Sequence, residues 1–454
     1  MVLNVRELHA ALHDLFNDTA RRHARETGFC LRERELTGPV FAQSLVFCLL
    51  ENPDSSLDDF ADFALRELGV DVTHQAFEER FTSSASLFFL SLFQEAFDRS
   101  FSSARPALLP LLRRFNGVFL RDATLIALPD CLAGLFPARD CNGTPTAALK
   151  LVLELEVATG RFTEASVLPG LHNEKTAEVS SKPLPEGALL LEDMGFLCGE
   201  RLQDYIRQGV YFLTRVPHWT AFFAKKEVGR GYERVDVLKW LRGAEGDCVE
   251  REIHILHAQK LRVRLLAVRV PEEEAERRRQ RVREEAKKRG RAVSREKLDL
   301  CEWNVLVTNA PAELLRAYDA WEVRRVRWQI ELVFRVFKSE GGIERTRAQN
   351  RWRVLAELFA KLLAMVVQQW ALLAAGYVML RHSARRAARR VRKQAPRLLQ
   401  ALASVEALAR EVSILAIQLD RRCKIERRHK QPSTFDRLAK LDAEFRLIEL
   451  TGES

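Results

Sequence analysis

Residues 324–339 read RRVRWQIELVFRVFKS, and this stretch decides the fold because it joins an apolar face to one acid among several basic residues. If it forms one helix at about 100° per residue, Arg327, Glu331 and Lys338 lie within about 40° of one another. A separate apolar face is formed by Val326, Ile330, Val333, Phe334 and Phe337. The pattern predicts a helix that packs through one face and presents a carboxylate beside two cations on another. An ion pair on a solvated helix face is the simpler alternative.

Two other acids occur where strands are expected. Asp122 lies inside the run FLRDATLIALP, and Asp193 follows the apolar run ALLLE. A carboxylate in an apolar strand is costly unless it is paired or bound to a metal. Glu192 and Asp193 point to opposite faces of a strand, so only one of them can join Asp122. Three carboxylates from separate elements could hold two divalent ions about 3.5–4 Å apart, and oxygen ligands suit magnesium.

These segments together resemble the YREK signature of bacterial insertion-sequence transposases of the insertion-sequence-4 type. Arg327, Glu331 and Lys338 match its Arg, Glu and Lys at the required spacing, whereas Arg324 stands where the family has tyrosine. The segments RDATLIALP and DMGFL are similar to those around the family's first and second acids, and VLVTNAP (305–311) is also similar. The resemblance extends from about residue 35 to about residue 380.

The resemblance implies an α/β fold, namely a ribonuclease-H-like mixed sheet with flanking helices, a mainly β insertion, and helical N- and C-terminal regions. It implies that Asp122, Asp193 and Glu331 are the catalytic residues and ligate two Mg²⁺ ions per active site, which Mn²⁺ could replace. Arg327 and Lys338 would hold DNA phosphates near the cut, and the guanidinium of Arg324 could take over the contact of the family tyrosine.

The implied activity is that of a DDE transposase, which cleaves DNA at transposon ends by two-metal hydrolysis and joins the freed 3′-OH to target DNA by transesterification. Its partners would be double-stranded DNA, in the form of terminal inverted repeats and target, and a second copy of the chain in a synaptic homodimer. No membrane is expected, and the protein would be cytoplasmic and nucleoid-associated in a bacterium. A catalytically decayed transposase that acts as a sequence-specific repressor is the alternative.

Three further residues are expected to contact DNA. Trp303, in CEWNVLVTN, occupies the place of a tryptophan that stacks on a flipped base in one branch of the family, and a core aromatic residue is the alternative. Arg215 and Lys150 lie on the strands expected at 210–216 and 147–160. Further strands are expected at 117–128, 161–170, 187–197 and 260–270.

The length of 454 residues suits several domains. We expect a helical DNA-binding domain at 1–110, the first part of the catalytic domain at 111–216, a mainly β insertion with a charged connector at 217–310, the rest of the catalytic domain at 311–380, and a basic helical region for DNA contact or dimerisation at 381–454. In the first of these, helices at 57–68 and after an N-cap at Thr73 could form a helix-turn-helix or a plain hairpin.

Composition agrees with a polyanionic partner. Lys and Arg exceed Asp and Glu by 72 − 62 = 10, and the pI is about 9.3. The cysteines are scattered without a CxxC motif, which argues against a disulfide framework and a thiolate zinc site and fits a reducing cytosol. Residues 362–380 carry no charge and could span a membrane, but the central Gln368 and Gln369 favour a buried core helix. The charged stretch 271–297 predicts a solvated helix or connector, whereas 381–397 has far fewer acids and predicts phosphate contact.

Overall fold

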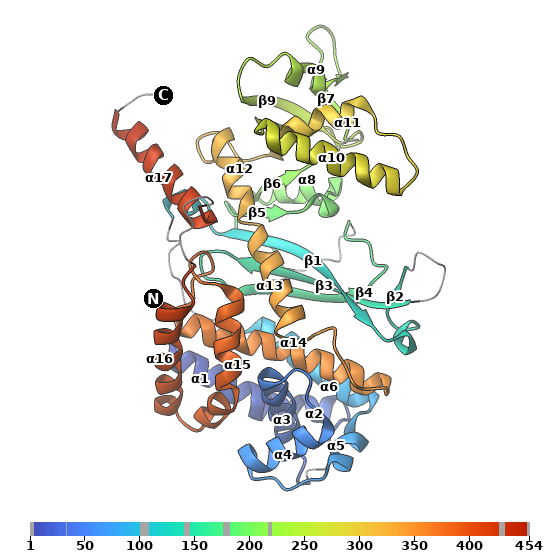
Figure 1. Ribbon diagram of the computed structural model, residues 1–454, viewed down its shortest axis with the longest axis vertical. Helices are drawn as coiled ribbons and strands as arrows, with labels where there is room; N and C mark the ends of the chain where they lie inside the picture. The colour runs from blue at the N-terminus through green and yellow to red at the C-terminus, as the bar shows by residue number, and fades with distance from the viewer. Residues whose placement is uncertain are drawn as a thin grey trace. The chain divides into compact units, whose positions relative to one another are not determined.

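The computed structural model (Figure 1) describes residues 4–32, 34–99, 109–139, 146–175, 182–216, 220–425 and 432–451. The chain forms two compact units, each assembled from three sequence segments. Unit 1 consists of Met1–Leu108, Asp122–His172 and Gln329–Ser433, and unit 2 consists of Leu109–Arg121, Asn173–Trp328 and Thr434–Ser454. Both units combine helices with strands, so the predicted mixed α/β fold is confirmed.

Unit 2 is built on a mixed sheet in the strand order β1-β5-β6-β11-β10-β9-β7-β8. Its parallel part consists of β1, which begins in unit 2, β5 and β6, and the other neighbours are antiparallel. The strands are β1 (Val118–Leu128), β5 (Leu189–Glu192), β6 (Tyr211–Arg215), β7 (Phe222–Lys225), β8 (Tyr232–Val235), β9 (Cys248–Ile255), β10 (Leu261–Arg269) and β11 (Trp303–Thr308). Strands β7 to β10 lie where a mainly β insertion is predicted.

The strands of unit 2 form where apolar runs can be buried. All residues of β5 are buried, as expected of a central parallel strand. In β10 the alternation of apolar and basic residues matches a strand whose apolar side faces a core of Val263, Leu265, Phe212 and Val307. The helices of this unit are α7 (Pro110–Arg113), α8 (Gly199–Arg207), α9 (Val237–Arg242), α10 (Glu272–Lys288), α11 (Arg295–Asp299), α12 (Ala317–Arg325) and α17 (Thr434–Thr451).

Unit 1 is mainly helical and centres on α14 (Arg351–Ala374), which packs against α6 and α3 (Figure 1). This helix is long and apolar enough to cross a membrane, but its whole apolar window is buried inside the structure, as predicted for a core helix. The other helices are α1 (Val5–Asp14), a π-helix (Leu15–Thr19), α2 (Ala20–Glu26), α3 (Gly38–Glu51), α4 (Leu57–Leu68), α5 (His74–Arg80), α6 (Ser83–Asp98), α13 (Trp328–Ser339), α15 (Ala384–Gln400) and α16 (Val405–Arg422).

Strands and caps of unit 1 follow local sequence signals. The later part of β1 belongs to this unit, together with β2 (Pro137–Ala138), β3 (Thr146–Glu156) and β4 (Phe162–Pro169), and β4 pairs antiparallel with β3. The hydroxyl of Thr73 accepts a hydrogen bond from the backbone N–H of Ala76 at 3.2 Å, which confirms the predicted N-cap of α5.

Candidate active site

Asp193 sits at the end of β5 in unit 2. The strand ends there because the carbonyl oxygen of Asp193 accepts a hydrogen bond from the backbone N–H of Phe196 at 3.0 Å, which closes a short 3₁₀ turn. The carboxylate is 40% exposed, and its Oδ1 lies 3.8 Å from Nη2 of Arg324, whose side chain is only 11% exposed. An acid with this exposure can accept a ligand from solvent while a fixed cation stands beside it.

Glu192, the residue before Asp193, has a different environment. Its side chain is 1% exposed and lies 3.7 Å from Nη1 of Arg121, which is 3% exposed. Nη1 of Arg121 also donates a hydrogen bond to the hydroxyl of Tyr205 at 2.5 Å. Burial raises the pKa of Tyr205, so its hydroxyl stays neutral. Glu192 is therefore committed to a buried ion pair, and Asp193 is the acid of this pair of neighbours that faces solvent.

Arginines gather beside Asp193. The guanidinium of Arg215, at the end of β6, lies over the ring of Trp321 on α12, 5.6 Å from its centroid. Burial lowers the pKa of Arg215, the positive charges of Arg278 and Arg327 lower it further, and the negative charge of Asp193 opposes them. Cations held this close to one another favour an anionic ligand, and guanidinium groups bind phosphate oxygens in pairs.

In unit 1, α13 carries two predicted site residues. Glu331 lies in its first turn and Lys338 in its last turn, and both are half-buried. Nζ of Lys338 donates a hydrogen bond to the carbonyl oxygen of Leu125 in β1 at 2.6 Å and lies 2.7 Å from Oε1 of Glu344. Asp122, also half-buried, accepts a hydrogen bond from the backbone N–H of Ala123 at 2.8 Å. Lys338 thus ties α13 to the strand that carries Asp122.

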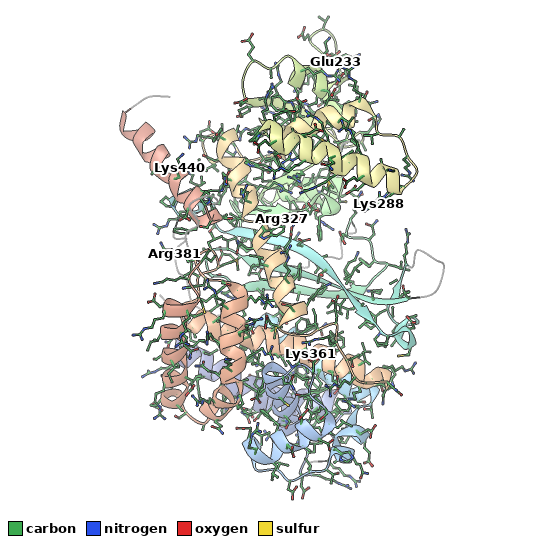
Figure 2. All side chains as sticks on the ribbon, viewed as in Figure 1. Glu233, Lys288, Arg327, Lys361, Arg381 and Lys440 are labelled. Atoms are coloured by element: carbon green, nitrogen blue, oxygen red, sulfur yellow. The ribbon has the colours of Figure 1, made fainter. Side chains whose placement is uncertain are left out.

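The prediction of one continuous helix over 324–339 is wrong. Helix α12 ends at Arg325 and α13 begins at Trp328, and Figure 2 labels Arg327 at the turn between them. In this turn the N–H groups of Val326 and Arg327 bond to carbonyl oxygens three residues earlier, at 3.0 and 3.1 Å, so the α-helical register is lost. Glu331 and Lys338 still share a face of α13, seven residues apart, but Arg327 is not part of that helix.

Two predicted DNA contacts lie in buried places. Trp303 is 6% exposed in the core of unit 2, and the guanidinium of Arg269 lies 4.6 Å from its ring centroid. This is the position of a core aromatic residue, the alternative left open by the sequence. Lys150 is 8% exposed, and its Nζ donates a hydrogen bond to the carbonyl oxygen of His172 at 2.6 Å. DNA contact by either side chain stays a prediction.

Carboxylate oxygens are the ligands that hard divalent cations prefer. Asp122, Asp193 and Glu331 offer only carboxylate oxygens, and their partial exposure leaves room for the waters that Mg²⁺ retains. Neither unit by itself contains, within the described ranges, a group of three His, Cys, Asp or Glu side chains that could hold a metal ion. Asp122 and Glu331 belong to unit 1, whereas Asp193 belongs to unit 2.

The sequence reasoning missed the buried partners of the site. Arg121 and Arg278 had no assigned role, although Arg121 fixes the neighbour of Asp193 and Arg278 is an electrostatic neighbour of Arg215. A usable signal existed for Arg121, because Arg-Asp in one expected strand and Glu-Asp in another offer a cation and an anion at matching positions. Nothing distinguishes Arg278 from the other arginines of its charged stretch.

The chain is similar in sequence to known transposases. The family model described as a transposase DDE domain matches residues 113–367. A transposase for insertion sequence element IS231F of Bacillus thuringiensis subsp. israelensis is 25% identical over 356 residues, which are 75% of this chain and 74% of the relative. A transposase for insertion sequence element IS1151 of Clostridium perfringens is 23% identical over 362 residues, 76% of each protein. A putative transposase of IS186A of Escherichia coli K12 is 32% identical over 29% of this chain and 37% of that protein.

Among solved structures, a piggyBac transposase synaptic complex with hairpin DNA aligns with a TM-score of 0.48 and 10% identity, covering 92% of this chain and 85% of that one. Neither the family model nor these relatives support the alternative of a non-catalytic repressor. Because the family match spans more than half of the chain, this protein belongs to the transposases with a DDE domain.

Proposed function

We propose that this transposase hydrolyses a phosphodiester at each end of its element and transfers the freed 3′-OH to target DNA. In this proposal Asp122, Asp193 and Glu331 together ligate two Mg²⁺ ions, with Mn²⁺ as a substitute. The carrying observation is the register of β1 on β5, in which Arg121 lies opposite Glu192 in a parallel pair.

The register explains how the first two acids would meet. Asp122 and Asp193 are the next residues along the two paired strands. Successive side chains point to opposite faces of a sheet, so both aspartates are directed away from the face that holds the Arg121–Glu192 pair. The backbone of Asp193 is still extended, with φ −81° and ψ 160°, so the alternation continues to this residue.

Chain connection supports Glu331 as the third ligand. Arg324, which stands beside Asp193, precedes Glu331 by only seven residues. At the other end of α13, Lys338 is bonded to Leu125, three residues beyond Asp122. Seven helical residues rise about 10 Å and three strand residues also about 10 Å. Glu331 and Asp122 are therefore at similar distances along the chain from the hydrogen bond between Lys338 and Leu125.

Each residue then has a role defined by its chemistry. The three carboxylates hold the ions, and Arg215, Arg324 and Arg327 hold phosphate oxygens on the two sides of the scissile bond. When bound, the two ions supply an activated water and neutralise charge that develops on the attacking and leaving oxygens. Lys338 positions α13 through Leu125, and it offers a cation to the DNA backbone from the same helix face as Glu331.

The partners in this proposal are the terminal inverted repeats, target DNA and a second copy of the chain in a synaptic homodimer. We also propose that residues 1–110 contribute DNA contacts through α4 and α5, and that the protein works in the cytoplasm at the nucleoid. The homodimer can be tested by measuring the mass of the complex that forms on a duplex with one inverted repeat. A homodimer would hold two such duplexes, whereas a monomer would bind only one.

The decisive experiment is cleavage of a duplex that carries the inverted repeats flanking the coding sequence, with Mg²⁺. Glu331→Gln should lower the cleavage rate by about two or more orders of magnitude, since it removes one ligand of ions that stabilise the transition state by several kcal/mol. Its affinity for the duplex should stay near that of the wild type. Titration of Mn²⁺, followed by electron paramagnetic resonance, should show weaker binding to the same variant.

The matched control is Glu313→Gln, which makes the same change at an exposed glutamate outside the site. This variant should cleave and bind Mn²⁺ as the wild type does. Undiminished cleavage by Glu331→Gln, or equal loss in both variants, would refute the assignment of the third ligand.

A further inference from the structure

Helix α15 in unit 1 has an unusual charge distribution. Its charged residues are all basic, and its buried face consists of Ala387, Ala388, Val391, Ala395, Leu398 and Leu399, with Gln394. On the opposite side, Arg385, Arg389, Lys393 and Arg397 are exposed at intervals of four residues. We call these four side chains the α15 stripe. Like charges four residues apart repel one another on a helix, so the stripe opposes the stability of the helix that carries it.

The buried acid that pairs with the α15 stripe carries too little charge to neutralise it. Glu340, only 4% exposed, lies 2.7 Å from Nε of Arg385, 3.0 Å from Nη2 of Arg389 and 3.6 Å from Nη1 of Arg392. One carboxylate thus faces three guanidinium groups. The side chains of Arg385 and Arg389 remain 63% and 53% exposed, so their outer N–H groups face solvent in fixed positions.

The outer half of the stripe has even less compensation. Across the described residues, no ion pair joins Lys393 or Arg397 to an acid. Helix α10 in unit 2 is the contrasting case, since four of its five arginines pair with glutamates of the same helix. Arg277 lies 3.4 Å from Glu274, and Arg283 lies 3.0 Å from Glu276. The paired arginines of α10 already have an anion beside them, whereas Lys393 and Arg397 have no paired acid among the described residues.

We propose that the α15 stripe binds the phosphate backbone of double-stranded DNA without reading its sequence. The proposal rests on the proposed function only in taking DNA as the substrate, and it adds a contact surface outside the arginines beside Asp193. Side chains that neutralise phosphates release condensed counterions, so binding at this surface depends steeply on salt. A charged surface that costs helix stability is expected where function requires it.

The test is the salt dependence of binding to a duplex of arbitrary sequence. Lys393→Gln/Arg397→Gln should reduce the magnitude of the slope of log K against log [KCl] by about 0.9 for each phosphate that the variant no longer neutralises. Both residues lie outside the Glu340 ion pairs, so the helix should fold as before, and circular dichroism checks this. The charge-retaining variant Lys393→Arg/Arg397→Lys should keep the wild-type slope.

The matched control is Arg277→Gln/Arg283→Gln in α10, which removes the same total charge from paired residues. It should leave the slope unchanged. A wild-type slope for Lys393→Gln/Arg397→Gln overturns the proposal, and so does an equal reduction in the α10 variant, which would indicate only a net-charge effect. Weaker binding to phosphatidylserine vesicles with an unchanged DNA slope also overturns it, in favour of a lipid surface. Glu331→Gln separates the two proposals, because it should lose cleavage with its slope intact.

Discussion

Replacement of Glu192 by glutamine should destabilise unit 2 far more than an isosteric change usually does. The substitution keeps the side-chain shape but removes the carboxylate that lies 3.7 Å from Nη1 of Arg121, a cation that is only 3% exposed. Removal of one partner from a buried ion pair costs about 3–5 kcal/mol, because the other charge stays buried without compensation. Since about 1.4 kcal/mol is a tenfold change, opening of this region should become roughly two to four orders of magnitude more frequent.

Hydrogen exchange measured by mass spectrometry can locate this effect. Peptides covering β5 and the paired part of β1 should exchange faster by that factor, because these strands are in register from Val118 opposite Leu189 to Arg121 opposite Glu192. Peptides from α14, the central helix of unit 1, should exchange at the wild-type rate and serve as an internal reference. The method also avoids treating a chain of two units as a single two-state transition.

Two variants control the experiment. Glu200→Gln makes the same chemical change at an exposed position of α8 and should leave exchange unchanged. Arg121→Met/Glu192→Leu removes both charges, and it should restore protection in β5, because a buried ion pair can be replaced by apolar residues at little or no cost.

If Glu192→Gln alters exchange in β5 by less than about 0.5 kcal/mol, the size of an ordinary surface substitution, the reasoning is refuted. Glu192 would then be available as the second metal ligand in place of Asp193. In that case Glu192→Gln would abolish cleavage, and Asp193→Asn would retain it.

Three further substitutions test other buried groups. Burial raises the pKa of Glu340, but hydrogen bonds from Arg389 and Arg385 outweigh this effect and lower it. The stabilisation by the Glu340 carboxylate is therefore present above the ordinary pKa of 4.5, and it is lost as pH falls through the folded-state pKa. Glu340→Gln should lower the free energy of unfolding by about 1–3 kcal/mol at neutral pH and by progressively less in acid. Thermal unfolding at a series of pH values measures this. Burial lowers the pKa of Lys361, so the unfolded chain binds more protons than the folded chain at pH values between the folded-state pKa and the ordinary value of 10.5. In this pH range the stability of the wild type to urea should rise with pH. The variant Lys361→Met should lack this rise. Trp303→Ala should destabilise unit 2 by about 3–5 kcal/mol as a core cavity, whereas a stacking role predicts a selective loss of about 1–3 kcal/mol in DNA binding.

The strands were predictable because their signals are local. The runs at 117–128 and 161–170 are rich in β-forming residues and are bounded by glycine or proline, and the structure places β1 at Val118–Leu128 and β4 at Phe162–Pro169. The core helix around Gln368 was also predictable, because the two amide side chains at the centre of its apolar run indicate a buried helix and not a membrane span. In each case a short window of sequence contains both the burial pattern and the stop signal.

The break between α12 and α13 has no such signal. Residues 324–328 contain neither glycine nor proline, and the helical periodicity continues through them. The turn is held by the N–H groups of Val326 and Arg327, which bond three residues back. Arg324 is held by Asp193, more than a hundred residues earlier in the chain. A periodicity argument cannot detect a boundary at which the anchoring contacts are so distant in sequence.

Charge is the property that sequence describes least completely. The basic run at 381–397 predicts phosphate contact, but the run alone does not show that Glu340 already holds Arg385, Arg389 and Arg392. The charged run at 271–297 is also rich in arginine, but it contains glutamates as well, and four of its arginines pair with them within α10. Only the contacts separate a neutralised arginine from one that can still bind an anion.

The two strands at the centre of the proposed site divide their charged residues by face. Arg121 and Glu192 lie opposite each other, are buried, and join β1 to β5 in a fixed register. Asp122 and Asp193 follow them, and one step along each strand reverses the direction of the side chain. A slip of one residue would bury an aspartate against Arg121 and expose Glu192. If Asp122 and Asp193 are metal ligands as proposed, the buried pair selects them through this register, and the stability of unit 2 and catalysis would then depend on the same strand pairing.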